Sequence, residues 1–339
     1  MNKITPLGRL IIVLLIIGAG FGIYTLLKNQ GIIGKTEPKT ETTDTDTEEE
    51  TENNTEKTDS KTDDKANENT KSGSFSYSPT EPVNGKHKGV VELGASGFNS
   101  FIITIDDQKN WKLDKAEFGT SLVKDGLATE DDIRIGLKAY ISKMIDFGVA
   151  GKDIHFVVSS GATKEAITVK ITKVLKTMGY NVNTVTPEQE GTYGMKATLP
   201  KEYENKAFFV DIGSGNTKIS WKENGQQKAL EAPGAKYYQK DIADKVVYDQ
   251  VAGKAKQIPA DNNKTCFIIG GSPFKFAKEV RKGKERYTVL KAPDSYDLTD
   301  KKDKAGLNIY KSIAEATGCE TFVFDWDTNF TIGFLLDLP

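Results

Sequence analysis

The chain has few of the side chains on which zinc sites and thiol chemistry depend. It contains two cysteines and two histidines in 339 residues, and Cys266, Cys319, His87 and His155 are far apart in the sequence. Zinc binding and thiol catalysis require such residues at characteristic spacings, so neither is favoured here. Both cysteines lie in apolar stretches and are expected to be buried thiols, with a disulfide left open if the domain lies outside the cytoplasm.

Arginine is scarce as well, with only four residues in the whole chain. The 46 lysines and arginines nearly balance the 48 aspartates and glutamates, and the formal net charge is −2. A nucleic-acid-binding surface needs clustered basic residues in excess, which this composition does not provide. No nucleic acid is therefore expected as a partner.

Residues 36–71 contain no leucine, isoleucine, valine or aromatic residue. This stretch consists of Thr, Glu, Asp, Asn, Lys and a few other small residues, with 13 acidic residues and five lysines. Such a composition cannot bury enough apolar surface to offset the conformational entropy that folding removes. We expect a disordered acidic Thr/Glu-rich linker over residues 28–80.

A long apolar run precedes this linker. Residues 10–27, LIIVLLIIGAGFGIYTLL, are uncharged and lie between Arg9 and Lys28. A helix needs about 20 apolar residues to cross a bilayer, so the run predicts a transmembrane helix after a short tail at residues 1–9. A cleaved signal peptide is the main alternative, although its apolar region usually has only about 7–15 residues. The expected location is single-pass in a membrane, taken as a bacterial inner membrane, and basic residues on both sides leave the orientation open.

The rest of the chain, from about residue 76, is long enough for two domains and contains an internal repeat. VVELGASGFNSFIITI and FVDIGSGNTKISW share one plan: an apolar strand, an acid, a glycine-rich turn and a second strand. The acids are Glu92 and Asp211. Backbone rich in glycine and small residues can form an anion-binding nest in such turns. The repeat predicts two related halves, each opening with a hairpin whose tip faces the other.

Between and after these hairpins, strand patterns alternate with helical ones, which predicts mixed sheets covered by helices. In the first half we expect a helix from Thr129 to Gly148, a strand at 153–160, a helix at 163–178, and a strand followed by an acidic turn at 187–191. In the second half we expect strands at 227–231, 265–271 and 321–324 and helices at 236–251, 273–280 and 302–317.

From about Gly89 onward the chain resembles the exopolyphosphatase/guanosine pentaphosphate phosphatase (Ppx/GppA) family of the actin, sugar kinase and Hsp70 ATPase superfamily. Six motifs in the family's order carry the resemblance: ELGASGFNS, FGTSLVKDGLATEDDI, SSGATKEA, VTPEQEG, VDIGSGNTK and IIGGS. The resemblance implies an α/β fold of two ribonuclease-H-like (actin-like ATPase) domains around a cleft, at residues 86–200 and 201–339.

The resemblance also implies hydrolysis of a terminal phosphoanhydride, in inorganic polyphosphate or guanosine pentaphosphate. Glu190 would be the catalytic base, and Glu92 and Asp211 would hold a magnesium ion. The phosphate-binding residues would be Gly94, Ala95, Ser96, Gly213, Ser214, Gly215, Asn216, Thr217 and Lys218, with Gly270, Gly271 and Ser272 contacting a nucleotide or phosphate. The simpler alternative is that both metal-binding acids cap turns and that Glu190 is a solvated acid near a helix start.

Four positions depart from the family's pattern. Asn99, Lys164 and Thr192 stand where the family has arginines, and Lys218 replaces an acid. Arginine binds phosphate through a planar two-pronged fork that lysine does not reproduce, so substrate positioning is expected to differ. Lys218 places a positive charge beside the expected magnesium ion, and at about 4 Å with an effective dielectric near 20 this interaction is on the order of 4 kcal/mol.

Three functions therefore remain open. The first is a membrane-anchored phosphoanhydride hydrolase, which Glu190 and Asp211 favour. The second is a module that senses polyphosphate or a nucleotide with little turnover, which Asn99, Lys164 and Lys218 favour. The third is a membrane-anchored scaffold of the same fold. The expected partners are the phosphate ligand and a lipid bilayer through residues 10–27, and a homodimer is left open.

Overall fold

The computed structural model describes residues 75–94, 97–118, 129–163 and 165–339. The predicted transmembrane helix at residues 10–27 and most of the predicted linker lie outside these residues. Across the described ranges, no helix has both the length and the apolar composition that crossing a membrane requires.

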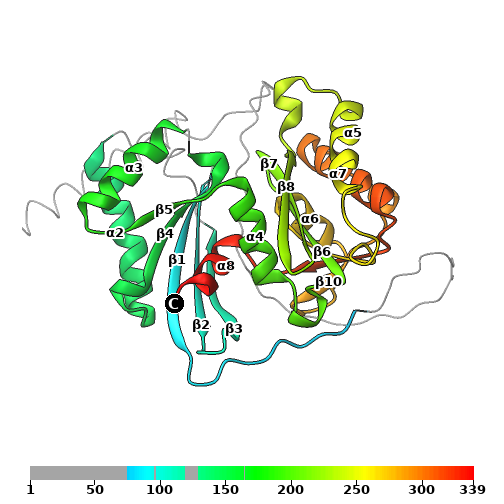
Figure 1. Ribbon diagram of the computed structural model, residues 1–339. Helices are drawn as coiled ribbons and strands as arrows, with labels where there is room; N and C mark the ends of the chain where they lie inside the picture. The colour runs from blue at the N-terminus through cyan, green and yellow to red at the C-terminus, as the bar shows by residue number, and fades with distance from the viewer. Residues whose placement is uncertain (1–74, 95–96, 119–128, 164) are drawn as a thin grey trace, which may run out of the picture. The chain divides into compact units, whose positions relative to one another are not determined.

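The described chain forms two mixed β-sheets with related strand orders (Figure 1). The first sheet has the order β3-β2-β1-β4-β5, and the second has the order β10-β11-β9-β6-β7-β8. In each sheet, three consecutive strands pair antiparallel and the following strands run parallel to the first of them, except β10, which pairs antiparallel with β11. Apart from the edge strand β10, the two orders are equivalent. The predicted α/β fold with a mixed sheet in each half is therefore confirmed.

The first sheet and its connections comprise β1 (Lys86–Gly94), β2 (Gly97–Ile105), β3 (Trp111–Phe118), α2 (Glu130–Phe147), β4 (Ile154–Val158), α3 (Ala166–Thr177), β5 (Val182–Thr184) and α4 (Pro187–Thr198). The second comprises β6 (Ala207–Ile212), β7 (Asn216–Glu223), β8 (Gln226–Pro233), α5 (Asp244–Ala255), β9 (Thr265–Ile269), α6 (Gly271–Lys278), β10 (Tyr287–Val289), α7 (Lys301–Thr317), β11 (Thr321–Asp325) and α8 (Phe330–Asp337).

Each sheet has one face covered by its own helices. Successive side chains of a strand point to opposite faces, so Val91 and Leu93 of β1 pack with α2 and α3 while Val90 points the other way. In the second sheet, Val210 of β6 packs with α5, α6 and α7, whereas Phe209 points away from them. Two further cores therefore form on the remaining faces.

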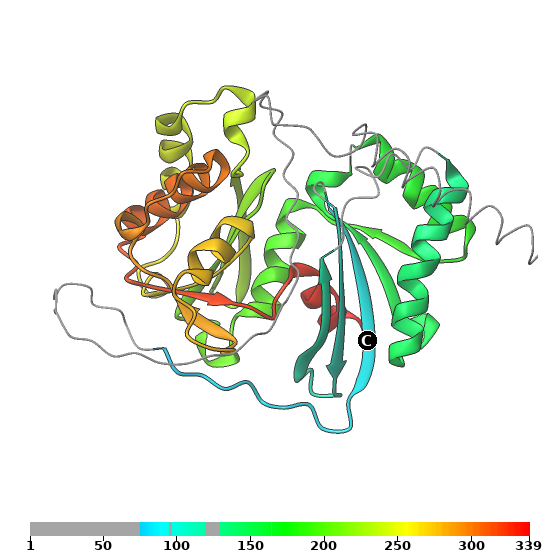
Figure 2. The same ribbon diagram turned by 180° about the vertical axis from the view of Figure 1, so that it is seen from behind.

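Helix α4 contributes to both of those remaining cores. Its Ala197 packs in the core on the first sheet, and its Met195, together with the C-cap residue Leu199, packs in the core on the second. Figures 1 and 2 show α4 between the two sheets, with the C-terminal helix α8 beside it. Since one helix is shared by two cores, the two halves are joined through α4.

The prediction of an acidic turn at residues 187–191 is wrong, because this stretch is the first turn of α4. Thr186 and Gln189 form a reciprocal capping box: the Gln189 amide donates to Thr186 Oγ1 (3.2 Å), and the Thr186 amide donates to Gln189 Oε1 (2.9 Å). Pro187 follows the cap at a position where a helix tolerates proline. These local signals start the helix that carries Glu190.

Other expected elements are present, some with shifted ends. Helix α2 begins after the predicted Thr129 cap and ends at Gly148, whose φ of 105° is left-handed. The helix expected at 236–251 is divided, because Asp241 has a φ of 52° and α5 starts only at Asp244. Strands β3 and β10 and helix α8 were not predicted. Both cysteines are buried and free, as expected.

Both ends of the described chain pack on the half that is distant in sequence. Phe75, at the end of the predicted linker, lies in an aromatic cage with ring-centroid distances of 5.5 Å to Tyr203, 5.4 Å to Phe267 and 5.4 Å to Tyr287. Conversely, α8 packs its apolar side chains in the core on the first sheet. The cores therefore cross the predicted boundary at residues 200 and 201.

A charged contact adds to this connection. Arg286 forms a two-pronged pair with Asp325 of β11, with both N–O distances at 3.0 Å. Its guanidinium also lies 4.3 Å from the ring centroid of Trp111, which belongs to β3 of the first sheet. A guanidinium over a tryptophan face is favourable, so this contact ties an edge of one sheet to the other.

The packing of α8 against α4 depends on a glycine. A β-carbon added at Gly333 would overlap the backbone carbonyl of Tyr193 in α4. We expect Gly333→Ala to destabilise the protein by roughly 1–3 kcal/mol, as overpacking of a core does. The matched control is Gly253→Ala in α5, where nothing lies within 4 Å of the added atom. Chemical unfolding of both variants tests this, and equal stability of the two would contradict it.

Candidate functional site

The two related hairpins place their acids at equivalent positions opposite a nitrogen donor. Glu92 of β1 pairs in register with Asn99 of β2, and Asp211 of β6 pairs with Lys218 of β7. The side chains interact as the register suggests: Asn99 Nδ2 donates to Glu92 Oε2 at 3.0 Å, and Lys218 Nζ lies 3.6 Å from Asp211 Oδ2. The two hairpins are therefore related in their side-chain pairs as well as in their sequences.

Lys218 also forms a short ion pair with Glu190. The distance from Lys218 Nζ to Glu190 Oε2 is 2.7 Å, and the two side chains are 7% and 0% exposed. An ammonium and a carboxylate at this depth lose most of their hydration, so each depends on the other for compensation. The structure therefore brings together Glu190, Asp211 and Lys218, which belong to three separate elements.

Glu190 reaches this position because α4 approaches the second sheet closely. Added β-carbons at Gly191 and Gly194 would lie 2.5 Å from Ser220 Oγ and from the ring of Phe209, respectively. The carboxylate is held further by Ser160, whose backbone amide donates to Oε1 at 2.9 Å and whose hydroxyl donates to Oε2 at 2.7 Å. Both oxygens of Glu190 are therefore hydrogen-bonded.

Glu92 joins the same group from the first sheet. Its Oε2 accepts hydrogen bonds from Asn99 and from Asn329 Nδ2, each at 3.0 Å. Asn329 is the N-cap residue of α8, where its side-chain oxygen accepts from the Thr331 amide at 2.9 Å. Sequence reasoning missed Asn329 because α8 was not predicted, although an asparagine before an apolar run is a typical N-cap signal.

Burial and the neighbouring charges shift the pKa values of Glu92, Asp211 and Lys218. Burial raises the pKa of Glu92, with Glu190 and Asp211 adding to the rise and its two asparagine donors opposing it. Burial also raises the pKa of Asp211. Burial alone lowers the pKa of an ammonium, but Asp211, Glu190 and Glu92 outweigh it, so the pKa of Lys218 is raised. Lys218 is thus held in its charged form.

The second predicted phosphate loop is a turn with open backbone donors. Gly213 and Asn216 hydrogen-bond to each other across it, and the amides of Ser214 and Gly215 have no acceptor among the described residues. Gly215 is exposed, whereas Thr217 is buried and its hydroxyl donates to the Pro233 carbonyl at 2.8 Å. The turn can therefore offer backbone N–H groups to an anion, while the Thr217 side chain is already engaged.

Asn216 links this turn to the first half. Its Nδ2 lies within hydrogen-bond distance of Ser160 Oγ at 3.3 Å and of Glu231 Oε1 at 2.7 Å. Ser160 is also the residue that holds Glu190. The motif after β4 and the glycine-rich turn after β6 are therefore in contact, as two halves of one site require.

The third glycine-rich segment has a different arrangement. Gly270 has a φ of 112°, and a β-carbon there would overlap the carbonyl of Ile212, so glycine is required by backbone packing. Ser272 is buried, and its hydroxyl has no partner among the described residues. Only Gly271 is exposed. A nucleotide or phosphate contact at residues 270–272 stays a prediction.

Several predicted residues lie elsewhere or outside the described ranges. Ala95, Ser96 and Lys164 are not described. Gly94 ends β1 and pairs with Gly97 across the first turn. Thr192 lines a separate pocket beside α4. The first phosphate loop therefore contributes Glu92 to the described site.

The predicted magnesium site at Glu92 and Asp211 does not fit a divalent ion. Glu92 accepts two amide hydrogen bonds, and an ammonium already lies beside Asp211 and Glu190. Magnesium requires near-octahedral oxygen ligands at about 2.0–2.1 Å, whereas Glu92 Oε2 and Asp211 Oδ2 are already engaged and the Lys218 ammonium repels a second cation. Among the described residues, no group of three or more His, Cys, Asp or Glu side chains is arranged to hold a metal ion.

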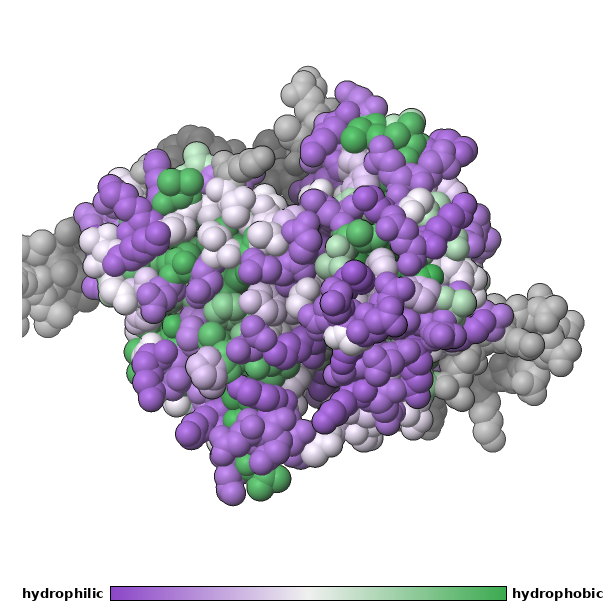
Figure 3. All heavy atoms as spheres, in the orientation of Figure 1, coloured by the Kyte–Doolittle hydropathy of each residue, from purple (hydrophilic) through white to green (hydrophobic). Residues whose placement is uncertain are grey.

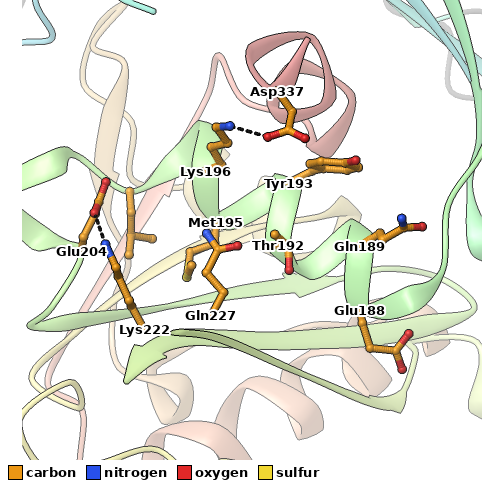
Figure 4. A pocket seen from close by; sticks show the side chains of 11 residues that line it. Glu188, Gln189, Thr192, Tyr193, Met195, Lys196, Glu204, Lys222, Gln227 and Asp337 are labelled. Carbon is orange, nitrogen blue, oxygen red and sulfur yellow. Dashed lines mark hydrogen bonds and ion pairs between the residues drawn. The ribbon is translucent and has the colours of Figure 1, made fainter. Parts of the chain in front are cut away.

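Glu92, Glu190, Asp211 and Lys218 are called the Lys218 group below. A pocket of ≈ 520 Å³ lies along α4 and is lined by none of these four residues. Figure 4 shows that it is bordered by two ion pairs, Lys196 with Asp337 and Lys222 with Glu204. In Figure 3 hydrophilic residues predominate on the visible face of the second sheet's half. The pocket contains none of the predicted site residues, and its lining of mutually paired charges leaves Lys218 as the better candidate centre.

Replacing Glu92 with glutamine should stabilise the protein at neutral pH. The raised pKa of Glu92 means that the folded state binds more protons than the unfolded state between the unfolded value, about 4.3, and the folded value. Stability is therefore lost as pH rises through this window, and the loss is complete above the folded pKa. The neutral amide avoids the loss while its oxygen still accepts from Asn99 and Asn329.

The measurement is the melting temperature of wild type and Glu92→Gln at pH 7 and near pH 4. We expect the variant to melt higher at pH 7, with the difference shrinking toward pH 4. Glu320→Gln, at an exposed position, is the control and should change little. A variant that melts lower than wild type at pH 7 would mean that the attraction between Glu92 and Lys218 outweighs the cost of burial.

Comparison with known proteins gives no match by sequence. No family model matches the chain, and no curated protein matches it. Solved structures do match. An exopolyphosphatase from Cytophaga hutchinsonii is 14% identical with a TM-score of 0.57, over 74% of this chain and 98% of that one. A Ppx-GppA enzyme from Aquifex aeolicus is 16% identical with a TM-score of 0.56, over 75% and 99% of the two chains.

A third structure, the type II variant of the Aquifex aeolicus Ppx/GppA phosphatase, is 15% identical with a TM-score of 0.55, over 74% of this chain and 98% of that one. All three alignments span nearly the whole of the solved chain. The described chain therefore has the fold of the Ppx/GppA phosphatase structures, as its sequence motifs predict.

Proposed function

We propose that the chain binds a phosphoanhydride, either inorganic polyphosphate or a guanine nucleotide such as guanosine pentaphosphate, where the two hairpin turns meet. One observation carries the proposal: a buried ammonium, Lys218, lies beside a glycine-rich turn whose Ser214 and Gly215 amides have no acceptor among the described residues. A positive charge and backbone N–H groups without acceptors favour the binding of a phosphate chain. The shared fold with exopolyphosphatase structures supports the same ligand class.

Binding without efficient turnover is the better-supported form of this function. A general base must reach the attacking water directly or through one further water. Glu190 has a fully buried side chain, accepts two hydrogen bonds from Ser160 and is paired with Lys218. A carboxylate with its oxygens engaged in this way is a poor acceptor for a proton from water.

Hydrolysis with Glu190 as base is the second candidate. One observation favours it: Glu190 lies where the motifs of both halves meet, between Ser160 after β4 and Lys218 on β7. Opening of the Lys218 pair on ligand binding would free one carboxylate oxygen. Hydrolysis predicts that phosphate release depends on Glu190, whereas binding alone does not.

Phosphate release from polyphosphate and guanosine pentaphosphate separates the two candidates. For a binding module, we expect calorimetric binding by wild type and phosphate release no faster than that of Glu190→Gln. The control is Glu188→Gln, which changes an exposed acid two residues earlier in the same helix. Release that is lost in Glu190→Gln, by about 100-fold or more as loss of a general base implies, and kept in Glu188→Gln would establish the hydrolase instead.

In this proposal, residues 10–27 anchor the binding module in a membrane bilayer. Their 18 uncharged apolar residues are close to the length that a bilayer core requires. The acidic composition of residues 36–71 suits a spacer between the bilayer and the folded part. The ligand would then be bound near a membrane surface.

Deleting residues 10–27 tests the anchor. We expect full-length protein in the membrane pellet after cell lysis and the deletion variant in the supernatant, because the apolar run alone supplies the transfer free energy. Deleting residues 40–57, a stretch of equal length in the linker, is the control and should leave the protein in the pellet. Full-length protein in the supernatant would exclude a permanent anchor.

A further inference from the structure

The Lys218 group contains an unusual arrangement of charge. Three carboxylates, on Glu92, Glu190 and Asp211, act on one ammonium, and each comes from a different element. Within the described residues, the ion pairs of Glu190 and Asp211 both go to Lys218. The ammonium is therefore the cation around which these acids are arranged.

Four of the six carboxylate oxygens, both of Glu190, Oε2 of Glu92 and Oδ2 of Asp211, have partners that a metal ion would have to displace. Glu190 Oε1 accepts the Ser160 amide, and Oε2 accepts the Ser160 hydroxyl and the Lys218 ammonium. Glu92 Oε2 accepts hydrogen bonds from two asparagine amides. The partly positive hydrogens of these amides would repel an incoming cation. Bringing a divalent ion here would also place it against the buried ammonium, at a distance where like charges repel strongly.

The position of the ammonium is fixed by rigid elements. Lys218 is on β7, between β6 and β8, and its backbone pairs with Asp211 on one side and Glu231 on the other. A β-carbon added at Gly213 would lie 3.7 Å from Lys218 Nζ, so the ammonium sits next to the glycine-rich turn. A phosphate bound at that turn would meet a positive charge that is already in place.

We propose that Lys218 is the resident cation of this site and takes the place of a divalent metal, so that the protein binds its anionic ligand without one. The binding of the anionic ligand by Lys218 rests on the proposed function. The role of Lys218 as the resident cation depends only on the Lys218 group. Lys218 is accordingly a positioning and binding residue, held in place by the acids that would otherwise ligate a metal.

The cation assignment is tested on the full-length protein without any ligand. Mn²⁺ binding is measured by electron paramagnetic resonance for wild type, Lys218→Gln, Lys218→Arg and the control Lys228→Gln, an exposed lysine on neighbouring β8. We expect Lys218→Gln to bind Mn²⁺ with at least about 10-fold higher affinity than wild type, because the carboxylates of Glu190 and Asp211 then lose their ammonium partner and need another cation. Lys218→Arg and Lys228→Gln should behave as wild type.

Two results would overturn the assignment. One is tight Mn²⁺ binding by wild type at this site, and the other is a folded Lys218→Gln variant that gains no affinity for Mn²⁺. If Lys218→Gln does not fold in chelator, its circular dichroism is followed as Mn²⁺ is added. Recovery of the folded signal supports the proposal, and failure to recover at millimolar Mn²⁺ contradicts it.

The ligand part is tested with tripolyphosphate as the probe, in EDTA and in excess Mg²⁺. We expect the affinity of wild type in the two buffers to agree within about 3-fold, a difference of less than 1 kcal/mol. A loss of affinity of more than about 10-fold in EDTA would mean that a metal is required. Absence of binding in both buffers would instead contradict the proposed function, and the Mn²⁺ measurements would still decide the role of Lys218.

Discussion

The ion pair between Lys218 and Glu190 is the interaction on which the arrangement of the two halves depends. Its partners come from the second sheet and from the helix that lies between the sheets, and both side chains are almost completely buried. Removing one partner from such a pair leaves an uncompensated charge, at a cost of about 3–5 kcal/mol. Asp211, Glu92 and Ser160 extend this interaction to three further elements, so the candidate site and the junction of the halves are one structure.

The glycine-lined face of α4 makes this pair geometrically possible. Gly191 and Gly194 let the helix approach β7 and β6 closely, while Ala197, Met195 and Leu199 bury apolar surface on both sheets. The buried apolar side chains therefore stabilise the position of α4. Because Gly191 and Gly194 have no side chains, the helix can lie close enough for Glu190 to reach Lys218. A larger residue at either glycine would move the carboxylate away from its partners as well as disturb the core.

The sequence was informative where chemistry follows from local pairing. The repeat predicted both hairpins and their acids, and the strand register of the structure then places Asp211 opposite Lys218 and Glu92 opposite Asn99. The pairing of Lys218 with Glu190 could not be foreseen, because it depends on α4, which was expected as a turn. Asn329 was missed for a similar reason, since only tertiary packing brings α8 to Glu92.

The aromatic cage around Phe75 has a consequence for how the chain is made. Phe75 is synthesised long before Phe267 and Tyr287, which complete its cage. The inner face of the first sheet is likewise covered only after the residues of α8 have been synthesised. Contacts between such distant residues close slowly. Neither half can be completed before the residues of α8 and of the Phe75 cage are made, so the newly made chain exposes apolar surface until then.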